Sequence, residues 1–329
     1  MRIFSGIQPT GEKHLGNLIG GFRQYAAMQE RGESFFCIVD LHSITVDYDP
    51  VDFRERTLDL AAMLFATGLD PDRSTVFAQS QVSAHAEAAW LLGSVTSYGQ
   101  LGRMTQFKDK SDRREFISAG LFIYPVLMAG DILLYQTDIV PIGDDQRQHL
   151  ELARDVAERF NSRFGETFRV PAGVYPAVGA RIMDLQEPTR KMSTTGGTPQ
   201  GTVLLIDEPD VIRKKLRSAV TDSGREVRRR EDKAGITNLI DILSALTGDA
   251  AGTIESRYDG AGYGQFKQDV GEAVVAVVEP IQLRYRELRS DPSELQRLLA
   301  VGAEKAREAS APTLAAMYER MGFVRSDPE

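Results

Sequence analysis

Short apolar runs and amphipathic stretches alternate along the first half of the chain. Strands are predicted at residues 3–4, 34–39, 75–78 and 138–143. Helical spacing of apolar residues predicts helices at residues 15–31, 51–68, 84–92 and 146–164. Strands that alternate with helices form mostly parallel sheets. The pattern therefore predicts an α/β fold.

The second half of the chain shows a different pattern. From residue 207 to residue 246 the periodicity is helical without strands, and residues 284–321 are again helical and can pack back on the sheet. At 329 residues the chain is long enough for two domains. We expect a parallel-sheet domain with a second, smaller all-helical domain.

The stretch from residue 3 to residue 21 combines a strand, a turn and a helix start. Helix N-termini present unpaired N–H groups and a partial positive charge, so phosphate is the natural ligand at such a turn. The spacing of Gly11 and Gly16 matches a P-loop, but Asn17-Leu18 stands where Lys and Ser/Thr should follow. A turn that only caps a helix is the alternative interpretation.

Residues 98–135 begin with a basic part and continue with an apolar part that holds a single carboxylate, Asp131. A buried charge needs a partner, and indole N–H is a donor only, so Asp131 is a candidate acceptor in a ligand pocket. A helix-capping role, or an ion pair with Arg103 or Lys110, is the alternative. Nearby, Ser83 is expected to cap the helix at residues 84–92, and His85 to lie on the surface or to face a partner.

Two basic segments lie further along the chain. The loop at residues 188–197 is small, polar and glycine-terminated and carries Arg190 and Lys191, which suits a mobile phosphate clamp as well as a plain solvated loop. Residues 213–233 hold nine Lys/Arg and four Asp/Glu, a balance of 9 − 4 = +5. This contrast with an acidic chain favours a polyanionic partner, and a solvated helical face is the alternative.

Composition narrows the class of protein. A net charge of −8 argues against general nucleic-acid affinity, so any RNA contact must be local. The single cysteine, Cys37, allows no intrachain disulfide and lies in a predicted inner strand, where we expect a core thiol. Four histidines with one cysteine match no zinc or iron–sulfur spacing. No apolar run approaches eighteen residues and no signal-peptide layout is present, so we expect a cytoplasmic protein without membrane contact.

Three separated motifs agree with one another. They are P-T-G-x-x-H-L-G-N at residues 9–17, Asp131 in its apolar helix, and K-M-S-T-T at residues 191–195. Together they resemble the HIGH and KMSKS signatures of class I aminoacyl-tRNA synthetases, and bacterial tryptophanyl-tRNA synthetases in particular. The similarity extends over nearly the whole chain, including residues 104–108, 137–141, 179–183 and 218–222.

The resemblance implies a domain plan and a reaction. The plan is a Rossmann catalytic domain at residues 1–190 with an inserted dimerisation segment at about 80–136, a small helical anticodon-binding domain at 191–283, and C-terminal helices at 284–329 that pack back on the catalytic domain. The reaction joins L-tryptophan to ATP, supplied with Mg²⁺, and passes the tryptophanyl group from its adenylate to tRNA(Trp). The resemblance also implies a homodimer, and the single cysteine excludes the family's iron–sulfur variant.

The resemblance also assigns residues. It implies that His14, Asn17, Lys191 and Lys110 take part in catalysis. ATP contacts fall to Gln8, Pro9, Thr10, Gly16, Asn17, Gly143, Asp144, Asp145, Ile182, Lys191, Met192, Ser193, Thr194 and Thr195. Tryptophan contacts fall to Asp131, Phe4, Gly6, Tyr124, Met128, Val140 and Gln146. Arg228, Arg229 and Arg230, from the basic segment, are expected to bind tRNA, and no protein-bound metal is expected.

The sequence departs from the family's pattern in one loop, and three alternative functions stay open. Thr194 and Thr195 replace the second lysine and last serine of the usual KMSKS loop, so Lys110 or Arg190 would have to supply the missing cation. The alternatives are a tyrosine-type enzyme of the same fold, a tRNA-independent or non-catalytic paralogue that binds tryptophan and nucleotide, and a nucleotide-binding regulatory protein. Intact His14, Gly16 and Lys191 favour the enzyme.

Overall fold

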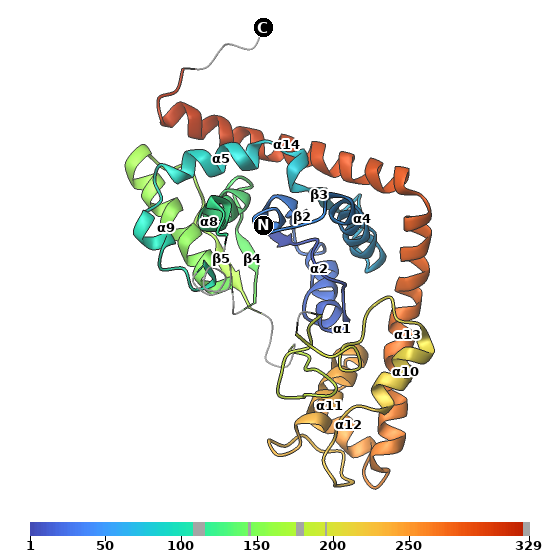
Figure 1. Ribbon diagram of the computed structural model, residues 1–329. Coiled ribbons are helices and arrows are strands. Elements are labelled where there is room, and N and C mark those ends of the chain that lie inside the picture. The colour runs from blue at the N-terminus through green and yellow to red at the C-terminus, as the bar shows by residue number, and fades with distance from the viewer. Residues whose placement is uncertain (108–115, 144–145, 176–180, 195, 325–329) are drawn as a thin grey trace.

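The computed structural model describes residues 1–107, 116–143, 146–175, 181–194 and 196–324. Its centre is a five-stranded sheet in the order β3-β2-β1-β4-β5, and every neighbouring pair is parallel (Figure 1). The strands are β1 (Arg2–Ile7), β2 (Glu33–Ile38), β3 (Ser74–Ala78), β4 (Ile139–Pro141) and β5 (Ala172–Val174). This confirms the expected α/β class and the four predicted strands.

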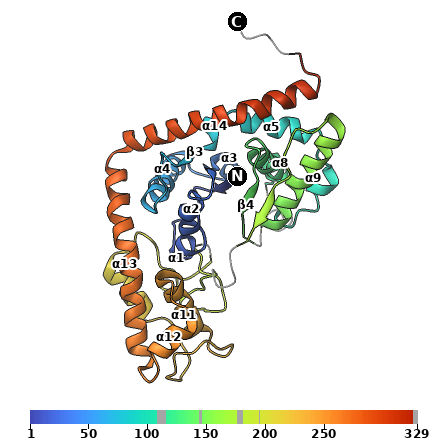
Figure 2. The ribbon, with the colours of Figure 1, turned by 180° about the vertical axis from the view of Figure 1, so that it is seen from behind.

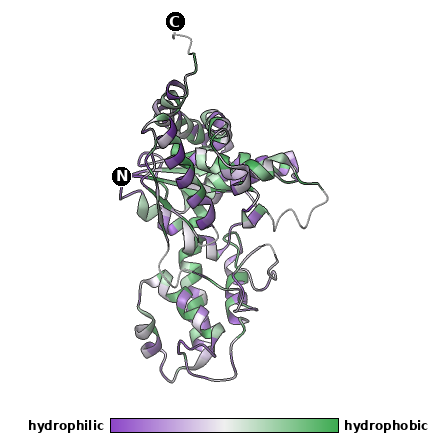
Figure 3. Cartoon of the chain, turned by 90° about the vertical axis from the view of Figure 1, so that its left-hand side faces the viewer, coloured by the Kyte–Doolittle hydropathy of each residue, from purple (hydrophilic) through white to green (hydrophobic). Residues whose placement is uncertain are grey.

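Helices cover both faces of the sheet. Side chains alternate across β2, so Phe36 and Ile38 join one core with helix α4, while Phe35 and Cys37 join a second core with helices α8 and α9. The helices of this part are α1 (Leu15–Asn17), a π-helical turn (Leu18–Phe22), α2 (Arg23–Met28), α3 (Asp40–Ser43), α4 (Pro50–Ala66), a 3₁₀ turn (Gln79–Gln81), α5 (Ala84–Gly93), α6 (Tyr98–Leu101), α8 (Ala119–Leu133) and α9 (Arg147–Phe164). Helix α9, predicted at residues 146–164, buries Leu152, Val156 and Phe160. These helices carry both polar and apolar residues, because one face of a helix is buried against the sheet and the other faces solvent (Figure 3).

The C-terminal part is helical. It consists of α10 (Pro209–Arg217), α11 (Ala234–Thr247), α12 (Ala251–Arg257), α13 (Gly262–Ser290) and α14 (Pro292–Arg320). Figures 1 and 2 show α10–α12 gathered below the sheet, α13 rising along α4, and α14 crossing above β3 and α5. The Asp291 side chain accepts a hydrogen bond from the main-chain N–H of Glu294, and Pro292 is the first residue of α14. The chain therefore turns sharply between α13 and α14.

Several local expectations were wrong. β5 lies in a segment where no strand was predicted, and the Ser83 side chain makes no capping hydrogen bond to α5. Residues 218–233 form no helix, so the arginines at 228–230 lie on a loop. Helix α13 passes unbroken through residues 283 and 284, so the expected boundary falls inside a helix shared by both parts. The expectation for Cys37 is confirmed, because this thiol is fully buried.

Candidate active site

A cavity of about 460 Å³ opens at the carboxyl ends of β1 and β4. The strand order reverses between these two strands, and ligands of open α/β sheets bind at such a point. All seven residues expected to contact tryptophan line the cavity: Phe4, Gly6, Tyr124, Met128, Asp131, Val140 and Gln146. Four of the expected ATP contacts line it as well, namely Gln8, Thr10, Asn17 and Gly143. The fold therefore brings the expected tryptophan contacts and part of the expected ATP contacts to one cavity.

The turn before α1 is held by its own polar groups. The main-chain N–H of His14 donates to Asn17 Oδ1 at 3.0 Å, so Asn17 closes the first turn of the helix. Lys13 Nζ donates to the carbonyl oxygens of Gln8 at 3.0 Å and Thr10 at 2.9 Å. Burial, and after it the charge of Arg56, lower the pKa of Lys13 to about 8. The turn is thus shaped before any nucleotide arrives.

His14 is buried at the entrance to α1. Its Nδ1 atom has no hydrogen-bond partner in the described part of the chain, and only 7% of the residue is exposed. Burial, and after it the charges of Lys191 and Lys13, lower the pKa of His14 to about 4. The ring is therefore neutral at pH 7 and carries one N–H that can donate a hydrogen bond.

The low pKa of His14 predicts an acid-sensitive stability. Between pH 6.5 and about 4 the unfolded chain binds a proton at His14 and the folded chain does not, so the free energy of unfolding should fall as the pH decreases through this window. A His14→Gln variant should lose less stability over the same window. Urea unfolding at pH 7 and pH 4.5 measures both slopes, and equal slopes would contradict a neutral His14.

The loop that begins at Lys191 lies against the turn at residues 9–17, although about 175 residues separate the two motifs. Leu15 N donates to Val203 O at 2.9 Å and Leu205 N to Lys13 O at 2.8 Å, so the segment after the loop pairs with the turn. A Cβ atom on Gly11 would come within 2.9 Å of Thr194 Oγ1. Lys191 is exposed, and its charge acts on His14. The structure thus assembles both class I motifs around one site.

Not every expected ATP contact presents its side chain to this cavity. Pro9, Gly16, Ile182, Lys191, Met192, Ser193 and Thr194 do not line it. Ile182 and Met192 are each 1% exposed, and Met192 N donates to Ile182 O at 3.0 Å, so these two side chains anchor the loop in the core. Arg190 is engaged as well, donating to Glu187 Oε2 at 2.7 Å and to Gly196 O at 2.8 Å. Lys110, Asp144, Asp145 and Thr195 lie outside the described residues.

Asp131 lies within α8, is 1% exposed and accepts three hydrogen bonds. They come from His42 Nε2 at 2.7 Å, Gln79 Nε2 at 2.6 Å and His85 Nδ1 at 2.6 Å. Burial alone would raise the pKa of Asp131, but the hydrogen bonds from the two histidines outweigh it and lower the pKa to about 2. Neither a capping role nor a pair with Arg103 describes this residue. The surface position expected for His85 is wrong, since His85 is fully buried.

Several residues of the site were not expected to lie around Asp131. His42 follows β2, Gln79 follows β3, His85 lies in α5, and Tyr135 follows α8. Only the folded sheet brings them together around Asp131. On the other wall, Tyr124 Oη is 2.8 Å from His149 Nε2 and 3.3 Å from Gln106 Oε1, and burial raises the pKa of Tyr124 to about 12. The tyrosine hydroxyl therefore stays protonated and can donate.

The described parts of the chain hold neither a cluster of metal-binding side chains nor a membrane span. Within them, no three His, Cys, Asp or Glu side chains are grouped so as to hold a metal ion. None of their helices combines the length and apolar character of a membrane span.

The model of the family described as tRNA synthetases class I (W and Y) matches residues 1–279. The chain belongs to this family. It is 49% identical over 327 residues to the tryptophan–tRNA ligase of Caldanaerobacter subterraneus subsp. tengcongensis, covering 99% of each chain. It is 52% identical over 328 residues to that of Leifsonia xyli subsp. xyli, covering 98% of this chain and 97% of the relative.

Solved structures of this W and Y family superimpose closely on the chain. The tryptophanyl-tRNA synthetase of Mycoplasma pneumoniae has a TM-score of 0.89 and 36% identity, with 98% of each chain covered. That of Campylobacter jejuni, complexed with ADP and tryptophan, has a TM-score of 0.85 and 34% identity, with 98% of this chain and 100% of the other covered. The similarity therefore spans both the sheet and the C-terminal helices.

Proposed function

We propose that this member of the W and Y family is a tryptophan–tRNA ligase, which activates L-tryptophan with ATP and transfers it to tRNA(Trp) in the cytoplasm. The observation that carries the proposal is the ionised Asp131 at the wall of the cavity, because an indole N–H needs a buried acceptor. Relatives named for the same activity, at about half identity over the full length, support it.

The first step needs positioned donors and no protein nucleophile. An oxygen of the substrate carboxylate attacks the α-phosphorus of ATP, the bond to the β-phosphate oxygen breaks, and pyrophosphate leaves. Negative charge spreads over the phosphate oxygens in the transition state, and fixed donors stabilise it. The His14 ring N–H, the Asn17 amide N–H groups and the Lys191 ammonium group are the donors we assign to this task. Asn17 can serve because its Oδ1 already accepts from His14, which leaves its amide N–H groups free to donate.

Magnesium belongs to the substrate in this mechanism. ATP enters with Mg²⁺ on its phosphates, and Mg²⁺ commonly keeps most of its ligands as water and phosphate. The ammonium group of the substrate only donates, so we assign to it two acceptors on the cavity wall, the Tyr124 hydroxyl oxygen and the Gln146 side-chain carbonyl oxygen.

An apolar groove beside the site supports the homodimer. Its volume is about 780 Å³, and it lies between α3, α5 and α8 with Trp90 85% exposed and Ile123 53% exposed on its rim. Thr45 and Tyr124 line both this groove and the substrate cavity, so a second copy seated there would touch the wall of the site. We propose that residues of the 80–136 segment make this contact.

The dimer proposal predicts a mass. Light scattering should give twice the chain mass of 36.4 kDa, and Trp90→Asp should shift the protein to a monomer because a carboxylate would be buried in the contact. A surface control, Val301→Asp on α14, should leave the mass unchanged. A wild-type monomer at micromolar concentration would contradict the proposal.

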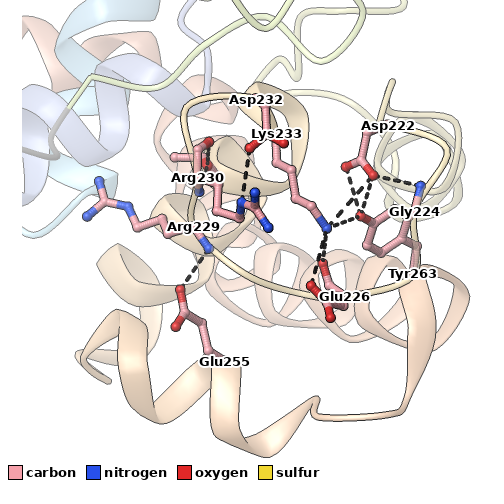
Figure 4. Close-up of polar contacts among 10 residues, drawn as sticks. Asp222, Gly224, Glu226, Arg229, Arg230, Asp232, Lys233, Glu255 and Tyr263 are labelled. Atoms are coloured by element: carbon pink, nitrogen blue, oxygen red, sulfur yellow. Dashed lines mark hydrogen bonds and ion pairs between the residues drawn. The ribbon is translucent and has the colours of Figure 1, made fainter.

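The helical part below the sheet is the proposed anticodon-binding domain. Within the described residues of the basic segment, Lys214, Arg217, Arg225 and Arg228 are exposed and make no ion pair. Arg229 instead pairs with Asp241 at 3.0 Å. Arg230 pairs with Asp232 at 3.1 Å (Figure 4). The Arg229 main-chain N–H also donates to Glu255 at 2.7 Å. Of the three arginines expected to bind tRNA, only Arg228 is thus free to meet a phosphate without first leaving a carboxylate.

This difference predicts unequal effects on tRNA charging. Arg228→Gln should weaken charging and reduce the dependence of affinity on log salt by about one, as expected for one lost phosphate contact. The triple change of Arg228, Arg229 and Arg230 to Gln should weaken charging further and spare pyrophosphate exchange. Arg229→Gln alone should mainly lower stability, because it leaves the half-buried Asp241 without its cation. Equal loss of exchange and charging in Arg228→Gln would show that the residue is structural.

A further inference from the structure

Behind Asp131, away from the cavity, lies a line of buried hydrogen bonds. Tyr135 Oη is 2.9 Å from His85 Nε2, and His85 Nδ1 is 2.6 Å from Asp131 Oδ1. Tyr135 and His85 are fully buried, and Gln79, which also donates to Oδ1, is fully buried as well. These side chains come from separate elements and do not line the cavity. They reach the substrate only through Asp131.

The direction of the donors in this line is fixed. Burial, and after it the nearby Cys37 and Asp131, raise the pKa of Tyr135 well above its usual range, so its hydroxyl keeps its proton. The Asp131 carboxylate can only accept, so His85 Nδ1 carries a proton, and the Tyr135 hydroxyl can donate to His85 Nε2. Nδ1–H then donates to the carboxylate. Tyr135, His85 and Asp131 therefore form a chain in which each group donates to the next.

This chain decides which oxygen of Asp131 is left for a ligand. Oδ1 accepts from both His85 and Gln79, so its two lone pairs are occupied. Among the described residues, Oδ2 accepts from His42 alone, and both His42 and Asp131 line the cavity. One acceptor position therefore remains on Oδ2, on the side that borders the substrate.

We propose that His85 and Tyr135 are positioning residues that set the selectivity of the site for an amino acid whose ring carries an N–H donor. They orient the Asp131 carboxylate and occupy its inner oxygen, so that the outer oxygen points to the ring N–H. The inference rests on the proposed function and adds two residues that never touch the substrate.

The test compares tryptophan with β-(3-benzothienyl)alanine, in which sulfur replaces the ring N–H. ATP–pyrophosphate exchange gives kcat and KM for each in the wild type, His85→Ala, His85→Asn and Tyr135→Phe. His85→Ala should reduce the preference for tryptophan by about tenfold through KM for tryptophan, since a hydrogen bond to a charged group is lost, and leave KM for ATP unchanged. His85→Asn, whose amide N–H can replace Nδ1–H, should recover most of the preference. Tyr135→Phe should give an intermediate loss, because the His85 proton is then free to move to Nε2.

A buried polar residue outside the chain serves as the control. Thr137 is 1% exposed and donates to Ile132 O at 2.6 Å, so Thr137→Val should lower the melting temperature and leave the preference unchanged. A folded His85→Ala protein that keeps the wild-type preference would overturn the proposal. So would a variant whose kcat/KM falls by the same factor for both substrates. If His85→Ala does not fold, Tyr135→Phe decides by the same comparison, since it removes a single oxygen. A wild type without tryptophan-dependent exchange would instead contradict the proposed function.

Discussion

An Asp131→Ala variant is expected to use tryptophan roughly ten- to a hundred-fold less efficiently, measured as kcat/KM in pyrophosphate exchange. A charge-assisted hydrogen bond lost from a buried site costs about 1.5–3 kcal/mol, which corresponds to that factor. The structure adds a second effect. His42, Gln79 and His85 would lose their shared acceptor, so the variant should also unfold more easily.

Two comparisons separate selectivity from stability in this variant. Asp131→Asn keeps the volume and one acceptor oxygen, so it should be more stable than Asp131→Ala and still select tryptophan poorly, because its amide group opposes donors. KM for ATP should stay near the wild-type value in both. If Asp131→Ala discriminated against phenylalanine and tyrosine as well as the wild type does, Asp131 would not be the selecting acceptor.

A Lys191→Ala variant is expected to slow pyrophosphate exchange by about 10²–10³-fold. Loss of one fixed donor to the transition state typically costs about 2.7–4 kcal/mol. Lys191 is the exposed cation of a loop whose neighbour Met192 is anchored in the core, and its charge reaches His14 across the site. The Lys191 ammonium group can therefore stay in contact with the pyrophosphate while it leaves.

Neighbouring variants test whether another cation replaces the missing loop lysine. Arg190→Ala or Lys110→Ala should slow exchange more than Thr194→Ala, which removes only a hydroxyl. The Arg190 side chain donates to Gly196 O within the same loop and pairs with Glu187. Arg190→Ala should therefore slow exchange partly by changing the conformation of the loop. If Thr194→Ala were the most damaging of the four, compensation by a second cation would be wrong. A harmless Lys191→Ala would favour the non-catalytic paralogue.

Local patterns in the sequence were enough to predict most of the sheet. β1, β2 and β3 carry apolar residues on both faces, because helices cover both sides, and such runs are visible in a single sequence. β5 was missed because three residues between prolines show no period, and only pairing with β4 makes them a strand. Residues 218–233 were expected to be helical because they continue a helical composition, yet Gly224 and side chains such as Asp222 and Lys233 hold them as a loop (Figure 4).

The candidate site likewise combines residues that the sequence identifies with contacts that arise only in the folded chain. Eleven of the residues lining the cavity were expected to contact tryptophan or ATP, and the fold brings these together. The partners of Asp131 could not be named, because each lies in a different element and the contacts span 46 to 89 residues along the chain. His85 was expected on the surface because α5 has no clear apolar stripe. Its burial follows from the close packing of α5 on α8, where Gly130 lies against the backbone of Ala89.

The most direct test is ATP–pyrophosphate exchange with each of the twenty amino acids in turn, followed by charging of tRNA(Trp) with the amino acid that supports exchange. The proposed function predicts rapid exchange with tryptophan, little with tyrosine or phenylalanine, and charging of tRNA(Trp). Exchange with tyrosine in place of tryptophan would assign the site to the other amino acid of this family. Absence of exchange with every amino acid would contradict an activating enzyme altogether.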